Sequence, residues 1–212
     1  MPVDYSIKPA TPRMIDHACK NFHYSQSIPC GRKVAFAIFE EGAFIGVIIY
    51  SLGANNNLAK SFHMEQGDVV ELTRIALKKH RNFVSLYIAR TLKDLKLISP
   101  RVQIVVSYAD IDHQAHAGAV YQATNWLYLG VSHTTDTQYF YNGKWTHERS
   151  INAVEDRVKR DTLKRSLPKR DNSDKHKYIF CFDRKLRKQY AKQSRPYPKA
   201  GEMTCHAVTL IS

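Results

Sequence analysis

Long apolar runs are absent from this chain of 212 residues. No stretch approaches the roughly 18–20 apolar residues that a membrane-spanning helix needs. The opening residues, MPVDYSIKPATPRM, lack the basic region and the apolar run of a secretory signal. The pattern predicts a soluble protein of the cell interior with no membrane partner.

Cysteine is scarce, and its spacing follows no pattern. The four residues, Cys19, Cys30, Cys181 and Cys205, form no CxxC pair. This spacing predicts reduced thiols, and it argues against a disulfide framework or a zinc ribbon. Each thiol is better explained as a small buried hydrophobe than as a nucleophile.

Acidic residues are few: 19 Asp and Glu stand against 32 Lys and Arg, for a formal net charge of +13. The excess is local, because residues 155–199 hold 16 basic and 6 acidic side chains, a net of +10. Such a bias favours neutralisation of nucleic-acid phosphates. The alternative is a basic tail that serves solubility alone.

Hydrophobic residues make up 43% of the chain, which is enough for one domain with a buried core. The apolar periodicity predicts helices and strands in an order typical of a mixed, antiparallel-led sheet flanked by helices. The predicted elements are a helix at 11–22, a hairpin at 34–39 and 44–52, a strand at 69–77, a helix at 83–96, a strand at 103–110, a short helix at 118–126, a hairpin turning at 142–143, a strand at 177–183 and a basic helix from 184. Thr11 is the expected cap of the first helix, with Pro12 at its first position.

The stretch 69–130 is the predicted active centre. It contains two strand-like runs, each ending in polar residues and each followed by a helix. Strand ends with helices leaving them commonly form a ligand cleft. The fold class is therefore α/β (α+β), with one pair of strands joined by a helical crossover.

This order resembles the fold of the GNAT N-acetyltransferases. Several motifs resemble more closely the phage Mom DNA-modification proteins, a divergent branch of that fold. They are FHYS at 22–25, ELTR at 71–74, VSYAD at 106–110, HAGAVYQATNWLYLG at 116–130 and RPYPK at 195–199. These pieces occur in the family's order across nearly the whole chain.

The resemblance implies an enzyme that adds a carbamoylmethyl group to the exocyclic amine of adenine in double-stranded DNA and so shields phage DNA from restriction. It implies the cytoplasm of a bacterial host, a catalytic domain at 1–153, and a basic segment at 154–212 that completes the fold and contacts DNA. The alternatives are an acyltransferase of the same fold acting on a small amine, a protein or RNA, and a non-catalytic DNA-binding module. The oligomeric state is open, with a homodimer among the options.

One departure concerns the donor. A typical acetyltransferase grips a pyrophosphate with a loop that reads Q/R-x-x-G-x-G/A, whereas residues 81–86 here read RNFVSL. A Cβ atom at those positions hinders the approach of the backbone to a phosphate. Acetyl-CoA remains an option for the donor, whose identity is left unknown.

The loop after the first helix contains His23, Tyr24 and Ser25, which we predict to be catalytic. An imidazole beside two hydroxyl groups suits general base chemistry near neutral pH. The alternative is a loop whose polar groups hydrogen-bond locally.

Arg74 stands in an otherwise apolar strand, so it either pairs with an acid such as Glu71 or binds a substrate anion in the cleft.

The second central strand ends with Ser107, Tyr108 and Asp110, at a position where ligand-binding groups gather in α/β sheets. We predict catalytic roles for Tyr108 and Asp110 and a substrate-binding role for Ser107. Asp110 is suited to orienting His23, to accepting a proton from the adenine amine, or to holding a metal. The alternative is a cap of the following helix.

Two more residues are predicted to bind substrate. Tyr121 and Asn125 are four apart, which places them on one face of the predicted helix, where they could stack on and hydrogen-bond to a flipped adenine.

His116 is a candidate metal ligand in the cluster D-x-D-H-x-x-H at 110–116, a set that suits Fe(II). The alternative is an ordinary polar loop.

Overall fold

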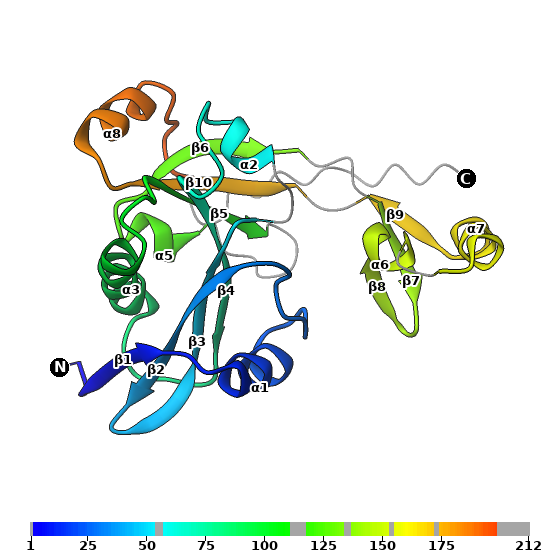
Figure 1. The fold of residues 1–212 in the computed structure, drawn as a ribbon, viewed down its shortest axis with the longest axis horizontal. Helices are drawn as coiled ribbons and strands as arrows, with labels where there is room; N and C mark the ends of the chain where they lie inside the picture. The colour runs from blue at the N-terminus through cyan, green and yellow to red at the C-terminus, as the bar shows by residue number, and fades with distance from the viewer. Residues whose placement is uncertain are drawn as a thin grey trace.

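The computed structural model describes residues 2–53, 57–110, 118–133, 137–152, 155–171 and 174–198. Its main sheet has seven strands in the order β1-β2-β3-β4-β5-β10-β6 (Figure 1). The strands are β1 (Tyr5–Pro9), β2 (Lys33–Glu40), β3 (Ala43–Ser51), β4 (Val69–Leu77), β5 (Ile104–Asp110), β6 (Leu127–Ser132) and β10 (Lys175–Cys181).

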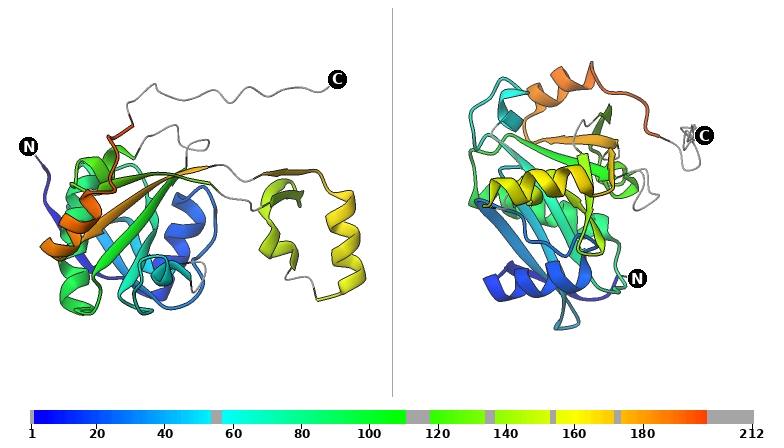
Figure 2. Two further views of the ribbon diagram at one scale, coloured as in Figure 1. Left: turned by 90° about the horizontal axis from the view of Figure 1, so that it is seen from above. Right: turned by 90° about the vertical axis from the view of Figure 1, so that its right-hand side faces the viewer.

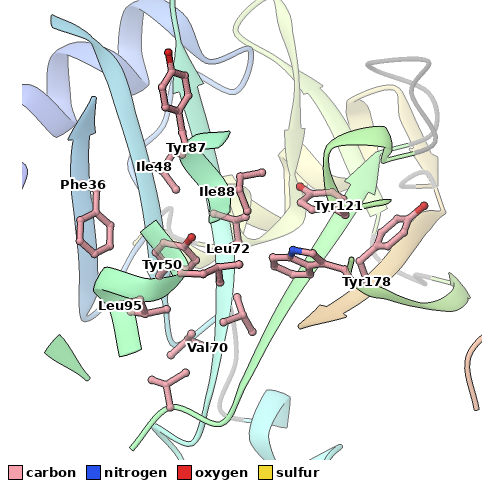
Figure 3. Close-up of a cluster of buried hydrophobic side chains, with 14 of the residues drawn as sticks. Phe36, Ile48, Tyr50, Val70, Leu72, Tyr87, Ile88, Leu95, Tyr121 and Tyr178 are labelled. Atoms are coloured by element: carbon pink, nitrogen blue, oxygen red, sulfur yellow. The ribbon is translucent and has the colours of Figure 1, made fainter. Parts of the chain in front are cut away.

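Helices cover both faces of this sheet because its strands alternate two apolar rows. On β3, Ile48 and Tyr50 pack with α3 (Val84–Ile98), whereas Val47 and Ile49 pack with α1 (Pro12–Phe22) on the opposite face. Figure 3 shows the α3 side of this core. The α1 side is extended by the four-residue α2 (Asn57–Lys60) and by α8 (Arg184–Ala191).

The local signals predicted most of these elements. Thr11 caps α1 by accepting a hydrogen bond from Met14 N at 3.3 Å, with Pro12 in the first turn, as expected. The predicted hairpin is confirmed in β2 and β3, and the predicted strands at 69–77 and 103–110 are β4 and β5. The mixed, mostly antiparallel sheet flanked by helices is confirmed: among the described strands of the main sheet, β4 and β5 form the parallel pair.

The short helix after β5 is a correction. The structure has α5 at Ala119–Gln122, four residues long, where the sequence predicted 118–126. Asn125 adopts the left-handed conformation with φ 62°, and the backbone N–H of Trp126 turns back to the carbonyl of Tyr121 at 3.1 Å. This turn places Trp126 in the core with no exposed surface, so burial of the indole outweighs helix propensity.

A second, smaller unit lies between β6 and β10 in the chain. It contains the sheet β8-β7-β9, formed by β7 (Thr137–Tyr141), β8 (Lys144–His147) and β9 (Lys169–Asp171), with helices α6 (Glu148–Asn152) and α7 (Arg157–Ser166). The predicted turn at Asn142-Gly143 is confirmed, with φ of 51° and 76°. Figures 1 and 2 show this unit standing beside the main sheet.

The two sheets group the residues differently from the predicted division at residue 153. Strand β10 and helix α8 belong to the main sheet, whereas α7 belongs to the small unit. The basic residues of 155–199 are therefore distributed over two separate parts of the molecule. Among the described residues, the helices include none with the length and hydrophobicity of a bilayer-crossing segment.

Gly46 marks the closest approach of β3 and β4. Its φ is +146°, and an added Cβ would lie 2.0 Å from the carbonyl oxygen of Ala76. We expect Gly46→Ala to lower the free energy of unfolding by about 3 kcal/mol, since backbone must shift to admit the methyl group. Gly143→Ala is the control: its φ is also positive but the space is open, so we expect a loss of about 1–2 kcal/mol. Equal losses in urea denaturation would contradict this assignment.

Candidate active site

The site begins where β4 and β5 part. The two strands pair in parallel over Val69–Glu71 and Ile104–Val106, and no further pairs follow along either strand. Beyond that point β4 remains bonded to β3 and β5 to β10. Two parallel strands that diverge leave a wedge between them, and the side chains at their ends face into it.

Ser107 bridges the strands at the point of divergence. Its buried hydroxyl lies 3.1 Å from the Leu72 carbonyl oxygen and 2.9 Å from the Tyr121 hydroxyl. Because the carbonyl only accepts and Ser107 has one proton, Ser107 donates to Leu72 and Tyr121 donates to Ser107. A side chain thus replaces the next rung of the parallel ladder. Ser107 and Tyr121, predicted as substrate-binding residues, hydrogen-bond to each other here.

A cavity of about 390 Å³ fills the wedge. It brings together the loop after α1, the outer half of β4, the ends of β5 and β10, and α5. Ten of its lining residues carry polar groups, and apolar side chains of β4, β5, α3 and α5 form the rest. The polar residues that concern the chemistry are His23, Tyr24, Glu71, Arg74, Tyr108, Asp110 and Lys175.

His23 is held by a chain of hydrogen bonds. Its Nδ1 accepts from the Ser25 backbone N–H at 3.1 Å and lies 2.8 Å from Ser25 Oγ. Ser27 Oγ donates to Ser25 Oγ at 3.1 Å, and Arg74 donates to Ser27 Oγ at 3.3 Å. Since a backbone N–H always donates, Nδ1 must be unprotonated, and the neutral ring carries its proton on Nε2.

The imidazole of His23 is neutral at physiological pH. Burial, and then the positive charge of Arg74, lower its pKa from 6.5 to about 4. Below pH 6.5 the unfolded chain binds a proton that the folded one does not, so this group's contribution to stability is present above pH 6.5 and is lost as the pH falls toward 4. A neutral Nε2–H is a hydrogen-bond donor, not a proton acceptor.

Arg74 is only half-buried, which differs from the fully buried arginine considered from the sequence. Its guanidinium donates to the Thr73 carbonyl at 2.7 Å and to the Ser27 carbonyl at 3.3 Å, and it forms no ion pair with a described residue. A β-bulge at this point of the β3–β4 pairing changes the alternation, so that both Thr73 and Arg74 line the cavity. Of the two alternatives, the structure has Arg74 lining the cavity and no ion pair between it and Glu71, while its substrate-binding role stays a prediction.

The tyrosines of the cavity are protonated. Burial raises the pKa of Tyr108 and of Tyr121 to about 12. Burial, with a smaller effect of the Asp110 charge, also raises the pKa of Tyr24, which stacks on His23 with ring centroids 4.4 Å apart. Each hydroxyl therefore keeps its proton, which Tyr121 donates to Ser107, and Asp110 lines the same cavity.

Two cavity residues were missed as site residues. Glu71 was considered only as a structural partner of Arg74, yet it lines the cavity, and burial raises its pKa against the opposing charges of Lys175 and Arg74. Lys175 pairs in register with Asp110 because β10 inserts beside β5. The polar position of Glu71 in an apolar strand was a usable signal for it. No sequence signal predicted Lys175 as a cavity residue, because only the order of the strands in the sheet brings it there.

One predicted site residue lies away from the cavity, and another lies outside the described residues. Asn125 is exposed and accepts hydrogen bonds from Arg187 at its carbonyl, 2.8 Å, and at Oδ1, 2.9 Å. It lies outside α5, so the shared helix face with Tyr121 was wrong. His116, with Asp112 and His113, lies outside the described residues. Within the described residues, no group of three potential metal ligands is present, and the Fe(II) site stays a prediction.

The loop before α3 is closed by a carboxylate of the protein itself. Glu40 is buried, and it accepts hydrogen bonds from the backbone N–H groups of Arg81, at 3.0 Å, and Asn82, at 2.8 Å, and from the Tyr87 hydroxyl. Burial alone would raise its pKa, but these hydrogen bonds outweigh burial and lower it. A carboxylate thus occupies amide donors that a pyrophosphate-binding loop would offer to its ligand.

The strand order and the divergence of β4 and β5 show that this protein has the GNAT acetyltransferase fold. Spermidine N-acetyltransferase SpeG from Vibrio cholerae has a TM-score of 0.50 at 10% identity, over 87% of this chain and 98% of its own. RimL, a ribosomal α-N-protein acetyltransferase in complex with coenzyme A, has a TM-score of 0.50 at 12% identity, over 86% and 97% of the chains.

The chain belongs to the Mom protein family, whose sequence pattern matches residues 4–199. Methylcarbamoylase Mom of Escherichia phage Mu is 29% identical over 187 residues, which are 84% of this chain and 76% of the phage Mu protein. The resemblance stated from the motifs is thereby confirmed. The family match supports a transferase related to phage DNA modification.

Arg74 gives a test of the site's electrostatics. We expect Arg74→Gln to raise the pKa of His23 from about 4 toward 6.5, since the guanidinium no longer disfavours the imidazolium. Arg74→Lys is the matched control, because it keeps the charge and should leave the pKa low. NMR titration of the histidine ring protons measures this, with His23→Gln identifying the signal. If both variants titrate like the wild type, burial alone sets the value.

Proposed function

We propose that this protein is a transferase that modifies DNA by adding a carbamoylmethyl group to the exocyclic amine of adenine. The family match to residues 4–199 is the observation that carries the proposal. The cavity supports it, because the family's polar motif residues His23, Tyr24, Arg74 and Asp110 all line it. Protection of phage DNA from restriction is the expected consequence.

The adenine amine is a weak nucleophile and is buried in the duplex, so the base must leave the stack and enter the cavity. The amine loses a proton as its nitrogen forms the new bond to the donor's methylene carbon, and the bond from that carbon to its carrier breaks, so that the carrier leaves with the bonding electron pair. Asp110 is the proposed acceptor, because His23 presents a donor, Nε2–H, in place of a lone pair. His23 and Arg74 then donate hydrogen bonds to the carbamoyl oxygen of the transferred group, which orients its methylene carbon toward the amine.

We propose that the protein does not bind its donor through a diphosphate group. Coenzyme A is the ligand that the fold suggests, but the residues before α3 do not fit it: Glu40 already holds two loop amides, and Val84 and Leu86 carry side chains where the fold's loop has glycine or alanine. A diphosphate at this loop would meet a carboxylate of like charge. The transferred group therefore arrives on a carrier that is recognised at the cavity.

Acetyl-CoA binding tests this part of the proposal. We expect isothermal titration calorimetry to detect no saturable binding at millimolar acetyl-CoA, with spermidine N-acetyltransferase as a positive control. Tight binding would contradict the assignment, and it would favour the alternative acyltransferase acting on a small amine, a protein or RNA. This measurement tests only the identity of the donor, and the DNA substrate is tested by mass spectrometry.

Nucleoside mass spectrometry tests the reaction itself. DNA from bacterial cells expressing the protein should contain a carbamoylmethylated adenine. We expect Asp110→Asn to reduce the adduct by about 100-fold or more, since it removes the proton acceptor. Asp94→Asn is the control, because Asp94 forms a surface ion pair with Arg90 on α3. Equal modification by both variants would contradict the role of Asp110, and a biological effect without any adduct would favour a non-catalytic DNA-binding module.

A further inference from the structure

The small sheet β8-β7-β9 has one covered face and one open face. Helix α6 packs on β7 and β8, where Tyr139 of β7 and Ile151 of α6 are buried. Side chains alternate along a strand, so Phe140 and Trp145 point to the opposite face. They are 40% and 38% exposed, respectively. Two large aromatic side chains thus remain partly exposed to solvent although the same sheet has a core.

The open face is preorganised. Phe140 and Trp145 are cross-strand partners, and their rings meet edge to face with centroids 5.5 Å apart. The guanidinium of Arg170, from β9, lies over the Trp145 ring at 4.4 Å and donates to Gln138 Oε1 at 2.9 Å. These contacts fix two aromatic rings and one planar cation beside one another on the same face of the small sheet. We call these four residues the aromatic platform.

The charge around the aromatic platform favours a polyanion. The described parts of the small unit, 137–152 and 155–171, contain 9 basic and 5 acidic residues, a net of +4. Helix α7 alone has five basic residues and one acidic residue in the sequence RVKRDTLKRS. The side chain of Arg157 on this helix is 85% exposed. Aromatic rings and guanidinium planes on an antiparallel sheet are the surface on which proteins stack unpaired bases.

We propose that the aromatic platform binds unpaired bases of DNA. The inference rests on the proposed function, because extruding an adenine leaves neighbouring bases and the orphaned thymine with exposed faces. The platform belongs to the small unit and shares no residue with the cavity at the parted strands. The main sheet would then supply the chemistry while the small unit holds the opened DNA.

Fluorescence anisotropy on the full chain tests the aromatic platform with three probes: single-stranded DNA, a duplex with one unpaired adenine, and a fully paired duplex. We expect the double variant Phe140→Leu/Trp145→Leu to bind the first two about tenfold or more weakly, since leucine keeps apolar area but has no ring to stack. The paired duplex should lose less. Arg170→Lys should show the same pattern, because it keeps the charge but loses the planar guanidinium.

Phe83→Leu is the matched control, since Phe83 is 83% exposed on the main sheet's side of the molecule and its loss should leave binding unchanged. Equal losses on all three probes, or unchanged binding of the single-stranded and unpaired-adenine probes, would each overturn the proposal. An unchanged thermal midpoint shows that the variants are folded. If the platform variants bind the unpaired probes more weakly but the wild-type protein leaves no adenine adduct in cells, the role of the aromatic platform stands and the proposed reaction is refuted.

Discussion

The parting of β4 and β5 is the constraint on which the site depends. Three parallel pairs join the strands, and then the Ser107 hydroxyl bonds to Leu72 where another backbone rung would have formed. Tyr121 donates to the same hydroxyl, which fixes α5 at the end of the wedge. An unsatisfied carbonyl in this buried place would be costly, so the serine stabilises an opening that the sheet would otherwise close. Each cavity side chain takes its direction from that opening.

Electrostatics then determine what this opening accommodates. Arg74 polarises a chain of hydroxyl groups that ends at His23, and together with burial it keeps the imidazole neutral. At the loop before α3, the Glu40 carboxylate accepts hydrogen bonds from two backbone amides, so these amides are not available to a phosphate. RimL has the same fold in complex with coenzyme A, and the bonding of Glu40 to two loop amides is the feature on which the proposal of a different donor rests.

The small unit is an insertion in the chain between two strands of the main sheet. It interrupts the chain between β6 and β10, yet β10 returns to the main sheet and inserts between β5 and β6. That insertion brings Lys175 to Asp110 and so completes the cavity. The basic segment consequently contributes to both parts: α8 packs on the main sheet, while α7 and the aromatic platform lie beside it. A charge count along the sequence shows the excess but not this division.

The sequence by itself determined the elements whose signals are local. The Thr11-Pro12 cap, the Asn142-Gly143 turn, the continuous apolar run of β5 and the ordered family motifs each depend on neighbouring residues, and each was predicted. Only the tertiary structure decided which strands are adjacent, that α5 ends early because Trp126 is buried, and that Glu71 and Lys175 meet Asp110 at one cavity. It also decided the tautomer of His23, since that depends on the positions of Ser25 and Arg74. Contacts between distant segments follow from packing of the whole chain, which local periodicity does not encode.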